Sequence, residues 1–66
     1  MLISQIEHEG IRATISYHQY SYIARLQRIS DNHVMATKVF GNGVGAEDWI
    51  LEELKLPPSI VILRYS

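Results

Sequence analysis

The chain has 66 residues, 47% of them hydrophobic, with seven acidic and six basic side chains and no cysteine. This length allows one domain, residues 1–66, with a small core and a thin margin of stability. The hydrophobic fraction excludes a disordered chain, and a net charge of −1 excludes a strong general attraction to nucleic acid or to an anionic membrane.

Residues 2–40 show the period of two that is typical of β-strands. An opening strand is expected over residues 2–7, and alternation of apolar and polar residues predicts strands over residues 11–18 and 22–27. A further strand is expected over residues 34–40. The turn near residues 19–21 has no strong turn dipeptide, whereas residues 30–33 read Ser-Asp-Asn-His, a sequence that favours a turn.

The period changes at residue 46 to that of an amphipathic helix. The apolar residues Ala46, Trp49, Ile50 and Leu54 fall on one side of the helix, so we expect Trp49 to lie in the core. Glu47 and Asp48 are placed in the first turn, where the helix dipole favours negative charge. Two prolines at positions 57 and 58 end this segment.

The last segment, residues 59–63, is apolar at every position after Ser59, which predicts an interior strand covered on both faces. The expected fold is therefore α+β, a four- to five-stranded antiparallel sheet with a single helix packed on one face, in the order βββ(β)αβ. One helix covers only one face, so we expect a homodimer through the other. The residues expected at this interface are Ile3, Ile23, Met35, Val61 and Leu63.

Residues 41–46 read Gly-Asn-Gly-Val-Gly-Ala, and Gly41, Gly43 and Ala46 match the G-x-G-x-x-G/A spacing of dinucleotide-binding loops. Only one expected strand follows, however, and Glu47 and Asp48 would repel a phosphate. We interpret the segment as a hinge between sheet and helix, in which the glycines adopt positive φ angles.

No motif in the sequence points to catalysis, a metal site or a cofactor. The histidines at positions 8, 18 and 33 match no zinc spacing, and no cysteine nucleophile or Gly-x-Ser-x-Gly elbow is present. The first residues carry no signal-peptide core, and no apolar run reaches the roughly 20 residues of a membrane span, so we expect a cytoplasmic protein.

Polar residues of the sheet form the expected binding surface, and they are Arg12, Tyr20, Arg25, Gln27 and Lys38. Arginine and tyrosine are common anchors of protein interfaces. The sequence thus favours a non-catalytic protein-interaction module that acts as a regulator or inhibitor by covering a partner's surface, and phage and mobile-element inhibitors are of similar size. The alternative is a nucleic-acid-binding module that uses Arg12, Arg25 and Lys38.

Overall fold

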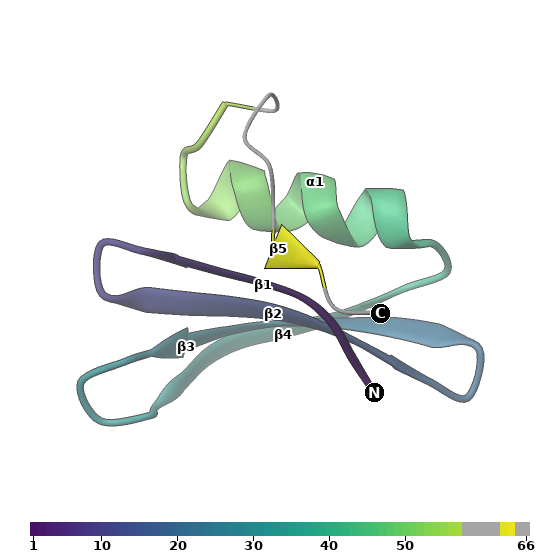
Figure 1. Cartoon of the computed structure of the whole chain (residues 1–66), viewed down its shortest axis with the longest axis horizontal. Coiled ribbons are helices and arrows are strands. Elements are labelled where there is room, and N and C mark those ends of the chain that lie inside the picture. Colours follow the sequence, from purple (N-terminus) through teal and green to yellow (C-terminus); the bar gives the residue numbers. More distant parts are fainter. Residues whose placement is uncertain (58–62, 65–66) are drawn as a thin grey trace.

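The structure of the chain is a computed structural model that describes residues 1–57 and 63–64. The elements along the chain are β1 (Leu2–His8), β2 (Ile11–His18), β3 (Ser21–Arg28), β4 (Val34–Phe40), α1 (Gly43–Glu53) and β5 (Leu63–Arg64). The strands form one sheet in the order β4-β3-β2-β1-β5, in which all neighbours are antiparallel. The helix lies along one side of the sheet (Figure 1), which confirms the expected α+β fold.

The core lies between α1 and the middle strands of the sheet. Alternate residues of β2 and β3 point toward the helix, and these include Ala13, Ile15, Ala24 and Leu26, all buried. The helix contributes Ile50, which is 1% exposed, together with other apolar residues of the same side. Trp49 packs against this core as expected, and its ring centroid lies 5.9 Å from that of Phe40.

Two hairpins with two-residue turns join β1, β2 and β3. Glu9 and Gly10 have φ angles of 49° and 78°, and Gln19 and Tyr20 have φ angles of 49° and 66°. Positive φ at both central residues is the property of the type I′ turn, which fits the twist of the strands and favours Asn-Gly. The second hairpin therefore forms where pattern alone predicted it, with two residues that this backbone conformation disfavours.

The helix begins three residues earlier than expected, at Gly43. Asn42 caps it, because its side-chain Oδ1 accepts a hydrogen bond of 2.6 Å from Gly45 N. Glu47 consequently lies in the second turn, and the first turn contains no acidic residue. Placing Glu47 and Asp48 in the first turn was wrong, because the asparagine cap overrides the low helix propensity of the glycines.

The glycines before the helix do not serve as a positive-φ hinge. Of the four glycines, all within the described residues, only Gly10 has a positive φ. Gly43 and Gly45 instead lie close to other side chains: a Cβ atom on Gly43 would lie 3.4 Å from the Tyr22 ring. On Gly45 it would lie 3.2 Å from Asn42 Oδ1. The distance at Gly43 is an ordinary van der Waals contact, whereas the one at Gly45 is tight, so the absence of a side chain at Gly45 leaves room for the Asn42 cap.

The final strand lies at an edge of the sheet and not in its interior. β5 pairs only with β1, through Ser4 with Arg64 and Gln5 with Leu63. Residues 58–62, which make up most of the segment expected as a strand, lie outside the described residues. Because four of the five residues of that expected strand are among them, its cover on both faces stays a prediction.

Candidate functional site

The face of the sheet opposite α1 is covered by no described element, and we call it the open face. Directly opposed residues of antiparallel strands lie on the same side, so the register identifies its members. The partners of the buried residues lie on the helix side, and the residues between them belong to the open face. These are Leu2, Gln5, Glu7, Arg12, Thr14, Ser16, His18, Ser21, Ile23, Arg25, Gln27, Val34, Thr37 and Val39.

The open face consists of three rows that cross the strands and differ in character. The first row is mostly apolar and runs Leu2, Ser16, Ile23, Val39. The second row is polar with one cation and runs Gln5, Thr14, Arg25, Thr37. The third row runs Glu7, Arg12, Gln27, Val34 and contains an ion pair. Polarity therefore increases along the strands from one end of the sheet to the other.

Exposed apolar side chains gather in and beyond the first row, at the end of the sheet that we call the apolar end. Five of the seven exposed large hydrophobic residues lie there: Met1 (76% exposed), Leu2 (38%), Tyr20 (88%), Val39 (60%) and Val44 (70%). Figure 1 shows why they meet, since the N terminus, the β2–β3 turn and the start of α1 lie at the same end of the molecule. Such a grouping marks an interaction surface when it is left uncovered.

The opposite end of the sheet carries ion pairs, and we call it the polar end. Arg12 Nε lies 2.8 Å from Glu7 Oε2, and His8 Nε2 lies 3.8 Å from Glu9 Oε1. A third pair joins Arg28 to Asp31 in the β3–β4 turn. All ion pairs found between described residues are at this end, so its charges are largely balanced internally.

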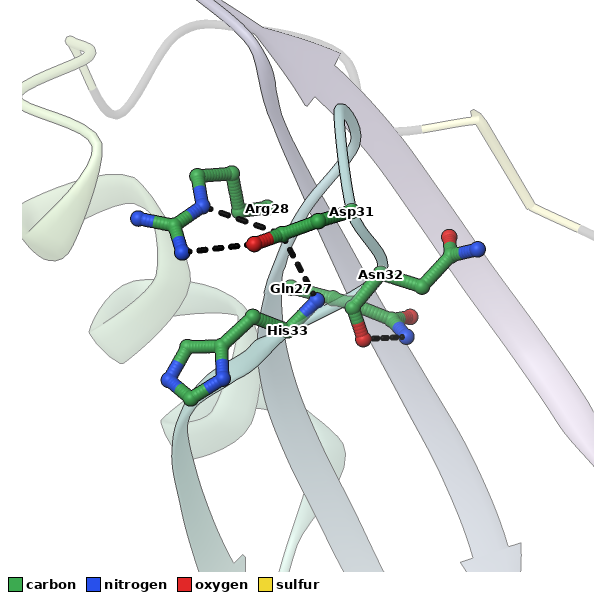
Figure 2. Close-up of polar contacts among 5 residues, drawn as sticks. All are labelled: Gln27, Arg28, Asp31, Asn32 and His33. Carbon is green, nitrogen blue, oxygen red and sulfur yellow. Dashed lines mark hydrogen bonds and ion pairs between the residues drawn. The ribbon is translucent and has the colours of Figure 1, made fainter.

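Figure 2 shows how the β3–β4 turn is held at the polar end. Arg28 donates two hydrogen bonds to the Asp31 carboxylate, at 3.0 and 2.8 Å, and Asp31 Oδ1 also accepts one from His33 N at 3.0 Å. Gln27 Nε2 donates to the Asn32 carbonyl at 2.7 Å, and Asn32 has a φ of 59°. The turn expected at residues 30–33 is confirmed, and its side chains serve the turn itself.

Asp31 gives the turn a defined dependence on pH. Hydrogen bonds from Arg28, and next from the His33 backbone, lower the pKa of the Asp31 carboxyl from 3.8 to about 2. The carboxylate therefore stabilises the fold above pH 3.8, and this contribution is lost as the pH falls toward 2. We expect Asp31→Asn to weaken the pH dependence of the free energy of unfolding in this window, as measured by urea titrations at several pH values. Asparagine keeps an acceptor for His33 N, so an unchanged dependence would contradict this assignment.

The residues predicted to bind a partner are only partly brought together. Arg25 and Gln27 lie on the open face as expected, and Tyr20 lies at the apolar end. Arg12 also lies on the open face, but its guanidinium is paired with Glu7. Lys38 does not join them: it pairs with the buried Ala24 on the helix side, with its Nζ 5.4 Å from the centroid of the Phe40 ring. Its inclusion was wrong because the register of β4 gives it the other face.

The three residues of the predicted dimer interface whose side chains the structure describes, Ile3, Ile23 and Met35, do not share one face of the sheet. Ile3 follows a register shift between Leu2 and Ser4 and packs against the core, so its place on the uncovered face was wrong. Met35 sits in a bulge of β4 and lines a hollow of 560 Å³ with Ile11 and Arg28, both on the helix side. Ile23 alone lies on the open face.

The other two residues of that expected interface cannot be placed there. Leu63 is described only by its backbone pairing in β5, and Val61 lies outside the described residues. The apolar end was missed by the sequence analysis, although the strand period already assigned Val39 to the side of Thr37. No feature of the sequence predicts that Val39 lies at the same end of the molecule as Met1, Tyr20 and Val44. These residues reach that end only because the turns between the strands place them there.

The structure offers no support for the ligand motifs considered from the sequence. Among the described residues, no group of three or more His, Asp or Glu side chains is placed to hold a metal ion. The dinucleotide-binding loop belongs to a parallel βαβ unit, whereas every strand pair here is antiparallel. The Gly45 amide that could meet a phosphate is already bonded to Asn42.

Within residues 1–57 and 63–64, no helix is long and apolar enough to cross a membrane. No protein-family model, curated protein or solved structure matches the chain.

Proposed function

We propose that the chain is a non-catalytic protein-interaction module that regulates or inhibits another protein by covering part of its surface. The observation that carries this proposal is the concentration of exposed hydrophobic residues at the apolar end. Of these, Leu2 and Val39 lie on the open face, Tyr20 lies in the β2–β3 turn, and Met1 and Val44 lie on the helix side of the same end. The adjoining row of the open face supplies Arg25, Thr14 and Gln5, which can form the polar rim that such interfaces have. The contact would thus combine an apolar centre with hydrogen-bonding groups on one side.

Tyr20 is the central residue of the proposed contact. Tyr20 is 88% exposed and lies at the tip of a two-residue turn, where its φ is 66°. This conformation is costly for residues other than glycine, asparagine and aspartate. Tyrosine combines a large apolar ring with a hydroxyl group and is enriched among the residues that dominate binding energy. A strained backbone that displays an aromatic side chain supports a binding role more than a structural one.

Nucleic-acid binding is less well supported by the arrangement of the basic residues. Of the three cations proposed for it, Arg12 is paired with Glu7, and Lys38 lies on the side of the sheet opposite Arg25. A bound nucleic-acid strand would therefore meet, among these three, only Arg25 as an open-face cation outside an ion pair. Binding that depends on releasing counterions needs several cations on one surface.

Affinity capture from the native host tests the proposed function. The immobilised chain is compared with Leu2→Ser/Val39→Ser, which alters the apolar end, and with Asp31→Asn at the polar end as a matched surface control. We expect one protein to be retained by the wild type and by Asp31→Asn and lost from the double variant. Retention by all three would contradict the proposed site, and recovery of nuclease-sensitive material alone would favour the nucleic-acid alternative.

A further inference from the structure

The outer edge of β4 is unpaired in the described part of the chain. β4 is the last strand of the sheet at the end opposite β5, and it is seven residues long. Natural proteins usually block such an edge with a bulge, a proline or a charged side chain, because an open edge pairs with other strands. The properties of β4 therefore decide whether it is a pairing surface.

The hydrogen bonds on the two sides of β3 show which backbone groups of β4 face outward. Arg28 N donates to the His33 carbonyl, on the β4 side of β3, and Ile29 N donates to Gly10, on the other side. Backbone groups alternate along a strand, so the even-numbered residues of β3 bond to β4. Their partners in β4 are Ala36, Lys38 and Phe40. It follows that Thr37 and Val39 direct their N–H and C=O groups to the free edge.

Neither the bulge nor the charged residue of β4 blocks strand pairing along the stretch from Ala36 to Phe40. The bulge lies at Met35, before the regular pairing that runs from Ala36 to Phe40. The one charged side chain, Lys38, points to the helix side and not along the edge. Val39 is 60% exposed on the open face, so a second strand laid beside it would bury apolar surface.

We propose that a second copy of this chain pairs antiparallel along the free edge of β4, with the two Val39 residues opposite each other. A two-fold axis at Lys38 would oppose the two ammonium groups, which destabilises the pairing. An axis at Thr37 would place Val39 against the bulge at Met35. An axis at Val39 joins the two valines and sets each Lys38 opposite the Phe40 ring of the other copy, a cation–π arrangement.

The remainder of the fold accommodates this pairing. A two-fold axis perpendicular to the sheet keeps both α1 helices on one side and makes the two open faces continuous on the other. Each helix packs over β2, β3 and β4. The two β3 strands would lie three strand spacings apart, roughly 14 Å, which exceeds the 8–10 Å that two packed helices need. The inference concerns self-association and stands independently of the partner protein proposed above.

Light scattering and amide hydrogen exchange test the proposal together. Between about 10 µM and about 1 mM, the range in which a small transient interface associates, we expect the mass to rise from 7.6 kDa toward twice that value. Over the same range, exchange at the Thr37 and Val39 amides should slow at least tenfold. Exchange at Lys38 and Phe40, already bonded to β3, should not change.

Two variants test whether dimerisation depends on the free edge of β4. Val39→Lys adds a charge to the pairing strand and should remain monomeric, whereas Gln5→Lys adds the same charge to the open face of β1 and should dimerise like the wild type. A monomer at every concentration would overturn the proposal, as would a dimer that Val39→Lys leaves intact. Protection of Thr37 and Val39 that appears only when another protein is added would show a different occupant and would also overturn it.

Discussion

Ile50→Ala should lower the free energy of unfolding by about 2–5 kcal/mol, because it removes a fully buried side chain and leaves a cavity. Ile50 is 1% exposed and lies at the centre of the contact between α1 and the sheet. A domain of this size is stable by only about 3–10 kcal/mol at the usual value per residue, so the variant is expected to lose a large share of its stability. Urea denaturation followed by circular dichroism measures the change.

The control for this prediction is Val44→Ala in the same helix. Val44 is 70% exposed, so the same kind of truncation there removes little buried surface and should change the stability by about 0.5 kcal/mol or less. A loss of less than about 1 kcal/mol for Ile50→Ala would contradict the described core. Similar losses for both variants would contradict the assignment of Ile50 to the core and of Val44 to the surface, because alanine has the higher helix propensity at both positions.

Replacing Gln19-Tyr20 by Asn-Gly should stabilise the chain and abolish partner binding. Both residues have positive φ angles in a type I′ turn, for which Asn-Gly is the favoured sequence. Relief of this strain should add about 1–2 kcal/mol to the free energy of unfolding, and each kcal/mol should raise Tm by about 4–8 °C. Loss of the exposed tyrosine should weaken binding about 30-fold or more if Tyr20 dominates the interface.

The two effects are separated by the single change Gln19→Asn. It relieves part of the strain and keeps Tyr20, so it should raise Tm without altering the affinity for the captured protein. A double variant that is more stable and still binds would contradict the role of Tyr20. A double variant that is less stable than the wild type would contradict the described conformation of the turn.

The fold was largely predictable because its strands alternate so regularly. The period of two over residues 11–18 correctly placed Arg12, Thr14 and Ser16 on the face away from the core, and Pro57 correctly followed the end of the helix. Local signals failed where a tertiary contact decides the conformation. The early helix start depends on the Asn42 cap, and it places Gly43 beside Tyr22, a residue 21 positions earlier.

The candidate site was harder to predict, because it depends on register and on the meeting of distant turns. Lys38 was assigned to the wrong face, because the alternation of residues within β4 does not determine the register of β4 against β3. Val44 and Met1 belong to elements far apart in the chain, and only the folded sheet brings them to the apolar end. Each exposed apolar residue of the apolar end stands alone in its part of the sequence, so no periodic pattern identifies it.

The most direct test of the apolar end as the binding surface is a nuclear magnetic resonance titration of the isotope-labelled chain with the protein recovered by affinity capture. The account predicts that the largest shifts occur at Leu2, Tyr20, Ile23 and Val39. It predicts small shifts at Arg28 and Asp31, which are bonded to each other at the polar end. Shifts confined to the β3–β4 turn, or to the outer side of α1, would contradict it.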